Sequence, residues 1–306
     1  MTLISYLTMR RKLVKQGAAT MMISLPAKWV KQNNLKKGSE IDLEQADNNL
    51  LISAKPIEEV KSEITIKLAN LTESSIRTLI TNTYRRGYDI IKVNFENEKQ
   101  FKILNNVVKT RLIGFDITEK EKGFCVVESI TEPSIEQFDI ILKKIFYNIT
   151  ELFEVTKKRI KGNVLDDYEE IEERIQKYDN FCRRVISKRK LINPKSEFLW
   201  TFLALLIHGQ REIYHLNKLL GIKVSDKTKE LLEDAKSMFE LIKKAYLEKN
   251  IDLLAKVHSL EKELIYKKAF SILQKTKGKE NPIIYHIMVA IREFYQSNSP
   301  LSGLIM

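Results

Sequence analysis

The most distinctive chemistry in the sequence is a run of cations without acids near its start. Residues 1–39 contain no Asp or Glu. The eight cations of this stretch are Arg10, Arg11, Lys12, Lys15, Lys28, Lys31, Lys36 and Lys37. They supply most of the formal net charge of +12. Because guanidinium and ammonium groups gathered in this way bind phosphate backbones, the stretch predicts a contact with nucleic acid, and a solvated basic edge is the alternative.

A second candidate site is acidic. Glu169 and Glu173 are four residues apart, which puts both carboxylates on one face of a helix. Carboxylate oxygens are suitable ligands for a hard cation, so a metal site at this helix is one hypothesis. An ordinary solvated acidic face is the other.

The remaining reactive residues predict no catalytic site. Cys125 and Cys182 have no nearby base in the sequence, so we expect buried structural thiols. His208 lies among Leu and Ile residues, which favours a hydrogen-bonded histidine in the core, and His215 and His286 have no ligand pattern around them. Since the chain has neither a recognisable triad nor a phosphate-binding glycine loop, we do not expect an enzyme.

Length and composition restrict the class of protein. The 306 residues are 43% hydrophobic and 30% charged, with 10 Gly and 6 Pro, which excludes collagen-like and disordered chains. The longest apolar run, 198–207, is half of the ~20 residues that a membrane span needs. No signal peptide is recognisable. We therefore expect a cytoplasmic protein without membrane insertion.

The first module, residues 1–55, alternates short strands and turns. An extended basic segment leads to a turn at 17–19, a second strand follows, and Pro26 begins a short helix. A hairpin over 41–52 with a turn at 47–49 completes the module. So few large apolar groups cannot form a sufficient core in one copy. The sequence therefore predicts an intertwined homodimer.

The motifs of this module resemble the AbrB/SpoVT-like swapped-hairpin DNA-binding domain. They are the basic strand 11–17 with its turn glycine, the run Ser24-Leu25-Pro26-Ala27-Lys28-Trp29, and Leu35-Lys36-Lys37-Gly38-Ser39-Glu40-Ile41. The resemblance implies a dimer whose swapped hairpins form one β-barrel. It also implies DNA contacts by Arg10, Arg11, Lys12 and Lys15, with Lys28 and Lys31 as secondary contacts. Ala18 stands where the family often has an arginine. We therefore expect contacts to phosphate, which require only cations, rather than contacts to specific bases.

Residues 58–132 predict a small α/β connector domain. Alternating apolar residues predict strands near 64–68 and 91–95, and helical spacing predicts helices over 74–86 and 101–112. A hairpin around Lys122-Gly123 follows. The order β-α-β-α-β-β is typical of a spacer or a small ligand-binding domain.

From residue 133 to 306 the pattern is helical and internally repeated. Leu152-Phe153-Glu154 corresponds to Met238-Phe239-Glu240, and a charged helix follows each triplet. Breaks in the pattern leave six helices, which we interpret as two three-helix repeats at about 135–221 and 225–298. The predicted fold class is thus multidomain α+β.

A doubled three-helix bundle behind a basic swapped hairpin resembles the archaeal phosphate-uptake regulators of the PhoU type. The acidic segment that includes Glu169, Glu173 and Asp179 lies where such proteins have an acidic helix. The resemblance implies a role in sensing phosphate status and a possible divalent or ferric ion at this helix. The residue four before Asp179 is Ile175, and in the second repeat His258, Glu261 and Glu263 copy the pattern poorly.

These features together predict a DNA-binding transcriptional regulator of phosphate uptake. It would bind double-stranded DNA as a homodimer and use its helical domain to sense an effector or bind a partner. The alternative is a PhoU-like adaptor that docks on a phosphate transporter ATPase or a sensor kinase, with the first module used only for dimerisation.

Overall fold

The computed structural model divides into two compact units, 1–60 and 61–306, which are described separately below. The residues that it describes are 9–46, 49–54, 61–69, 72–131, 137–162, 167–188 and 195–306. Within these ranges no helix is both long and apolar enough to cross a membrane. Mixed α and β elements, with a largely helical second half, agree with the predicted α+β class.

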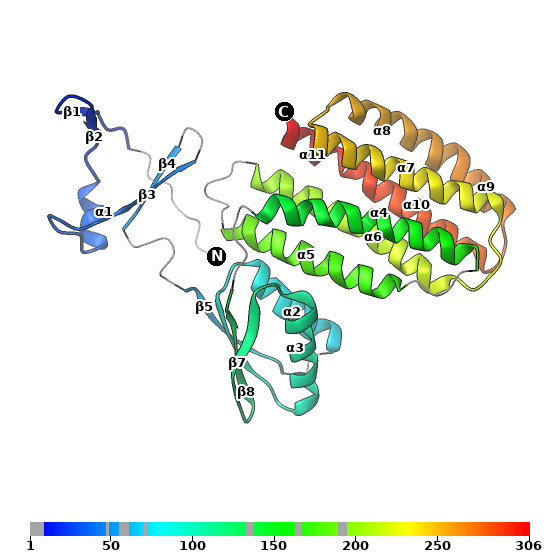
Figure 1. Ribbon diagram of the computed structural model, residues 1–306, viewed down its shortest axis with the longest axis horizontal. Helices are drawn as coiled ribbons and strands as arrows, with labels where there is room; N and C mark the ends of the chain where they lie inside the picture. Colours follow the sequence, from blue (N-terminus) through cyan, green and yellow to red (C-terminus); the bar gives the residue numbers. More distant parts are fainter. Residues whose placement is uncertain are drawn as a thin grey trace. The chain divides into compact units, whose positions relative to one another are not determined.

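The first unit contains two separate hairpins and one short helix (Figure 1). Its elements are β1 Val14–Gln16, β2 Thr20–Met22, α1 Ala27–Gln32, β3 Asp42–Ala46 and β4 Asn49–Ser53. The antiparallel pairs β1–β2 and β3–β4 form two distinct two-stranded sheets, so the described chain contains no closed barrel. Two residues of the predicted second turn, Asp47 and Asn48, lie outside the described residues.

None of the described residues of the first unit is buried. Leu13 is 67% exposed and Met21 is 61% exposed, and Ile23, Leu43 and Leu50 are similarly open. A two-stranded hairpin with such side chains in water is marginally stable at best. The described residues of the first unit therefore expose apolar surface that could form a core, but they form no core within the single chain.

The second unit begins with a four-stranded sheet covered by two helices. The elements are β5 Glu63–Lys67, α2 Glu73–Arg85, β6 Ile90–Asn94, α3 Glu98–Arg111, β7 Phe115–Glu121 and β8 Phe124–Ser129. The strand order is β5-β6-β8-β7, with β5 and β6 parallel and the other pairs antiparallel. This is the element order that the sequence predicted. Alternating residues such as Ile91, Val93, Cys125 and Val127 form a core together with residues of α2 and α3.

Nine helical segments follow in the described part of the second unit. They are α4 Phe138–Ile160, α5 Tyr168–Lys188, α6 Ser196–Leu219, α7 Asp226–Glu248, α8 Asp252–Lys262, the π-helix η2 Glu263–Ala269, α9 Phe270–Lys275, α10 Glu280–Gln296 and α11 Asn298–Ile305. Because α8, η2 and α9 are continuous, the first six helices match the six that were predicted. The terminal helix α11 was not predicted.

The two triplets that suggested an internal repeat meet between α4 and α7. Phe153 and Phe239, which are 86 residues apart in the chain, contact each other with ring centroids 5.9 Å apart. On one side of this contact Glu154 pairs with Lys236, and on the other Thr150 donates to Glu240 at 2.6 Å. The same 86-residue spacing relates these two pairs. The contacts therefore follow a pseudo-twofold pattern.

Helix α5 joins the sheet domain to the bundle, with α2 and α3 packed beside it in Figure 1. Arg184 of α5 is 1% exposed and donates to the backbone oxygens of Tyr84 at 3.1 Å and Tyr88 at 2.7 Å. It also pairs with Asp89 at 2.6 Å. The segment predicted as a connector is thus fixed to the bundle through a buried guanidinium.

Candidate nucleic-acid interface

The β1–β2 hairpin presents the first group of candidate residues. Its strands pair Val14 with Met22 and Lys15 with Met21, and a three-residue turn connects them. Gly17 has a φ of 71°, a conformation that L side chains rarely adopt, so glycine is favoured at this position. The turn that the sequence predicted at 17–19 is confirmed.

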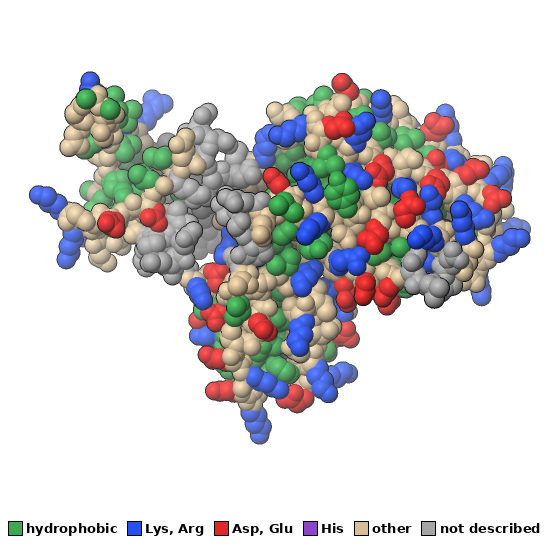
Figure 2. Space-filling model, viewed as in Figure 1, with side chains coloured by type: hydrophobic (Ala, Val, Ile, Leu, Met, Phe, Trp, Pro, Cys, Tyr) green, Lys and Arg blue, Asp and Glu red, His purple; other side chains and the backbone are tan. Residues whose placement is uncertain are grey.

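The six predicted DNA contacts are all exposed. Arg10, Arg11 and Lys12 precede or lead into β1, Lys15 lies in β1, and Lys28 and Lys31 lie in α1. No ion pair between any of these cations and another described residue is present. Figure 2 shows blue cationic side chains beside green hydrophobic ones on this unit. Cations that are not neutralised locally are available to bind an anionic partner.

Local backbone contacts hold the short helix that carries Lys28 and Lys31. Pro26 precedes the helix with φ −65° and ψ 125°, and its carbonyl accepts the first helical bond from Val30 at 3.0 Å. At the other end the side chain of Asn33 donates to the carbonyl of Trp29 at 2.9 Å. The predicted helix start at the Ser-Leu-Pro motif is therefore supported by the structure.

The arrangement suits contacts to phosphate. The described residues 9–39 have cations on a strand, on the segment before it and on a helix, and the sequence places no carboxylate among them. Cations need only proximity to bind phosphate, whereas base readout needs defined side-chain geometry in a groove. The exposed apolar side chains of the same hairpins are available for packing against another copy.

The acidic helix does not form a ligand set. Glu169 and Glu173 are exposed near the start of α5, and Asp179 lies ten residues beyond Glu169, which is about 15 Å along a helix. Asp179 is 1% exposed and pairs with Arg183 at 2.8 Å and Arg85 at 3.0 Å. Among the described residues no group of three His, Cys, Asp or Glu side chains could hold a metal ion. The structure thus gives Asp179 a structural role between two arginines.

Two expectations about α5 and α6 are wrong. The sequence has a second cationic cluster, Arg183, Arg184, Lys188, Arg189 and Lys190, whose pattern predicts the exposed end of a surface helix. Instead, Arg183 and Arg184 are buried in ion pairs. Arg189 and Lys190 of that cluster lie outside the described residues. The side chain of His208 is 61% exposed and lies 3.8 Å from the carboxylate of Glu293, so it is not a core histidine. Its apolar sequence neighbours occupy other faces of the same helix.

The cysteines are buried thiols, as expected. Both are free. Burial raises the pKa of Cys125 to about 11 and raises the pKa of Cys182 well above its ordinary value. Thiols with raised pKa values are poor nucleophiles at neutral pH.

The contact between Asp89 and Arg184 was not predicted from the sequence. Burial raises the pKa of Asp89, but hydrogen bonds from Lys188 and Ser62 lower it by more, so that it lies below its ordinary value. Lys188 pairs with Asp89 at 2.7 Å. Two consecutive arginines in a helix with an otherwise amphipathic pattern were the available signal.

Comparison with protein families gives one match. Residues 14–62 match the family described as "Antidote-toxin recognition MazE, bacterial antitoxin". The match begins at β1, extends past β4, and supports the expected AbrB/SpoVT-like swapped-hairpin module. Comparisons with curated proteins and with solved structures gave no significant match. The similarity to PhoU-type regulators therefore stays a prediction.

Proposed function

We propose that this chain is a transcriptional regulator that binds double-stranded DNA as a homodimer through its first unit. One observation supports this most strongly: the range that matches the swapped-hairpin family presents uncompensated cations and unburied apolar side chains together. The apolar side chains of two copies would form the shared core. The cations would then lie on the outside of one dimeric module.

The proposed contacts are mainly electrostatic. Arg10, Arg11, Lys12 and Lys15 would bind the DNA backbone from the first hairpin, and Lys28 and Lys31 would add contacts from α1. Phosphate contacts position a protein on DNA without reading its sequence. Sequence preference would then depend on the polar residues of the hairpin and on DNA shape.

We further propose that the helical domain transmits phosphate status to this module. The order of a basic swapped hairpin followed by two three-helix repeats supports this proposal. The α4–α7 contacts, in which Phe153 meets Phe239, are consistent with a duplicated bundle. No catalytic role is proposed for either unit.

Salt dependence of duplex binding tests the proposal. Neutralising six phosphates on each bound dimer should give a log–log slope of about −5, at roughly −0.9 per phosphate. Replacing Arg10, Arg11 and Lys12 with Ala in every chain should weaken binding and make this slope clearly shallower. Fluorescence anisotropy on a labelled duplex at several salt concentrations measures both quantities.

Matched variants distinguish the regulator from the adaptor alternative. Replacing Lys256, Lys277 and Lys279 of the helical bundle with Ala removes the same amount of charge and should leave duplex affinity nearly unchanged. Equal losses in the two triple variants, or duplex binding that the Arg10, Arg11 and Lys12 variant retains in full, would contradict the proposal. Sequencing of bound fragments from cells at high and low phosphate tests the phosphate part.

A further inference from the structure

The pseudo-twofold pattern of the bundle relates one face of α5 to one face of α8, η2 and α9, and only the face of α5 is covered by another domain. In the first repeat, Asn180 and Arg184 of α5 hold the sheet domain. Asn180 donates to the backbone of Arg111 at 2.8 Å and accepts from Arg85 at 2.7 Å. Arg184 lies over the rings of Tyr84 and Phe115 at 5.0 and 4.7 Å. This face of α5 therefore forms the contact between the helical bundle and the sheet domain.

The corresponding face of the second repeat is open. The 86-residue spacing that relates Phe153 to Phe239 places Tyr266 at the position of Asn180 and Phe270 at the position of Arg184. Tyr266 is 57% exposed and Phe270 is 41% exposed, and the centroids of their rings lie 6.2 Å apart. Large aromatic side chains that are open to water on a well-packed helix are typical of contact sites for other proteins.

Helix α10 forms the second wall of this face. Arg292 of α10 donates to the hydroxyl of Tyr266 at 3.3 Å, and Tyr295 lies 3.2 Å from Nδ1 of His258. Helices α8, η2 and α9 on one side and α10 on the other thus form a continuous strip. The π-helical turn η2 carries Tyr266, and such turns are frequent at functional sites.

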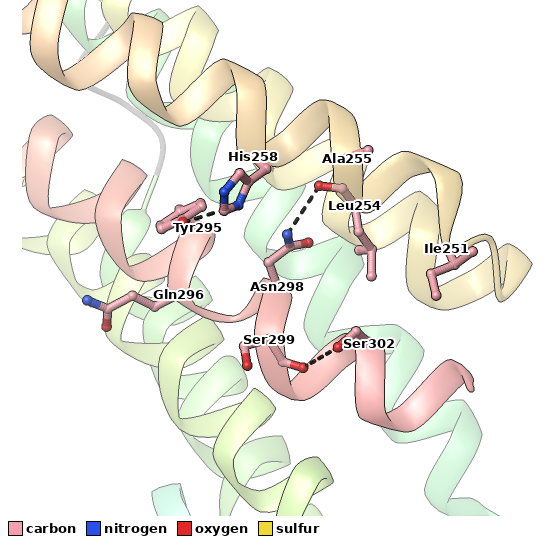
Figure 3. A pocket seen from close by; sticks show the side chains of 9 residues that line it. All are labelled: Ile251, Leu254, Ala255, His258, Tyr295, Gln296, Asn298, Ser299 and Ser302. Carbon is pink, nitrogen blue, oxygen red and sulfur yellow. Dashed lines mark hydrogen bonds between the residues drawn. The ribbon is translucent and has the colours of Figure 1, made fainter.

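The strip leads into a cavity of about 740 Å³ beside α11. Figure 3 shows His258 and Tyr295 on facing helices, with Ile251 and Leu254 on one wall and Asn298 and Ser302 on the other. The side-chain nitrogen of Asn298 donates to the carbonyl of Leu254 at 3.1 Å. Its oxygen is buried without a hydrogen-bond partner among the described residues. The cavity thus joins an apolar wall to a polar one.

The segment that forms one wall of the strip carries an excess of positive charge. Residues 252–279 contain seven lysines and three acids. Six of these lysines are exposed, among them Lys256, Lys262 and Lys267. Two of the acids, Asp252 and Glu263, are also exposed, whereas Glu261 is buried and faces Arg292 at 3.6 Å. The exposed side chains therefore carry an excess of positive charge. A second copy of the same positive face would be repelled, and an acidic surface would be attracted.

We propose that the strip formed by α8, η2, α9 and α10 binds an acidic amphipathic helix of a partner protein. The occupant is a helix because the corresponding face of the first repeat is covered by the helices α2 and α3. Its apolar side chains pack on Tyr266 and Phe270 and fill the cavity, and its carboxylates pair with Lys256, Lys262 and Lys267. This binding is separate from the proposed DNA contacts of the first unit.

Three synthetic helical peptides test the proposal on the full-length protein. They share one apolar face and carry Glu, Gln or Lys on the polar face. We expect the Glu peptide to bind at least tenfold more tightly than the other two, as measured by fluorescence anisotropy. The double variant Tyr266→Ala, Phe270→Ala should weaken this binding at least tenfold. The matched control Tyr147→Ala, which removes another exposed aromatic ring from the bundle, should not.

A charge variant keeps the test decisive if the aromatic variant fails to fold. Lys262→Glu with Lys267→Glu changes only exposed side chains, and it should shift the preference away from the Glu peptide. Equal affinity for the three peptides, no binding by any of them, or insensitivity to both variants would overturn the proposal. A decrease in molar mass by light scattering in the aromatic variant would identify a second copy as the occupant and overturn it too. Duplex affinity, measured in parallel, should stay unchanged in every variant, so that failure of this proposal is distinguishable from failure of DNA binding.

Discussion

Arg184 brings a guanidinium into a site that is almost closed to water. Three acceptors surround it: the carbonyls of Tyr84 and Tyr88 and the carboxylate of Asp89. Two aromatic rings cover its faces. Removing one partner of a buried ion pair costs more than the pair contributes, because the other partner is left without its compensation.

Replacing Arg184 with Met should therefore destabilise the second unit by about 3–5 kcal/mol. The Met side chain fills similar space but cannot donate to the two carbonyls, and the buried Asp89 carboxylate keeps only its bonds from Lys188 and Ser62. Urea unfolding followed by circular dichroism measures the loss. Arg174→Met on the same helix removes half-exposed ion pairs and should cost less than about 1 kcal/mol. Similar losses in both variants would contradict this account of the junction.

Glu172 gives a prediction about pH. Burial raises its pKa, and the hydrogen bonds from Gln210 and Gln176 offset this only in part. A carboxyl group whose pKa is higher in the folded state makes the protein less stable as pH rises from the ordinary carboxyl range through that raised value. Glu172→Gln should therefore stabilise the protein more at pH 7.5 than at pH 4, as measured by urea midpoints. Glu173→Gln, which replaces an exposed carboxylate next to it in the chain, is measured as the control. A pH-independent difference for Glu172→Gln would refute the prediction.

The packing of α6 against α10 depends on Gly209, because a glycine has no side chain to keep the two helices apart. A Cβ on Gly209 would lie 2.6 Å from the ring of Phe294, which is fully buried between Phe153 and Phe239. A buried ring in a dense core has no space into which to move. Gly209 therefore sets how closely the two third helices of the repeats approach.

Gly209→Ala should destabilise the bundle by about 1–3 kcal/mol, because the core becomes overpacked. Gly303→Ala in α11 is a matched control, since its Cβ would also meet a phenylalanine ring, at 2.7 Å. That ring belongs to Phe198, which is partly exposed and can move into solvent. Thermal unfolding of the two variants should separate them, and an equal decrease in Tm would show that burial of the ring is not the cause.

Local elements were predictable because they depend on nearby residues. The turn at Gly17, the helix after Pro26 and the β-α-β-α-β-β order of the sheet domain follow from turn residues and periodicity, and the structure contains all of them. The contact of Asp89 with Arg184 joins residues 95 positions apart, and single-sequence periodicity carries no information on such pairs. His208 was misplaced for a related reason, since apolar neighbours in sequence do not determine which helix face a residue occupies.

The candidate site was predictable in part. An acid-free cationic stretch and a recognisable motif identified the first unit, and the family match covers most of that unit. The repeat spacing relates Tyr266 and Phe270 to Asn180 and Arg184, but the sequence could not show that α2 and α3 cover the face of Asn180 and Arg184, because this depends on how the sheet domain packs on the bundle. Nor could it show that Asp179 lies between two arginines.

For the whole molecule, the absence of buried residues in the described first unit predicts two kinds of unfolding. The first unit should gain its protection from association, so its amide hydrogen exchange should slow as protein concentration rises. The second unit has its own extensive core and should be insensitive to concentration. Hydrogen-exchange mass spectrometry at about 1 and 100 μM compares β1–β4 with α4–α10. Protection of β1–β4 that does not change with concentration would argue against a shared core.

The buried guanidinium of Arg184 also has a genetic consequence. A recombination event that deleted the coding region for 61–131 would remove Tyr84, Asp89 and Phe115 together. Arg184 of α5 would then lose the acceptors and rings that surround its guanidinium. The sheet domain and the bundle should therefore be inherited as one cassette. The boundary at which shuffling between genes would do least damage lies near residue 60, ahead of both.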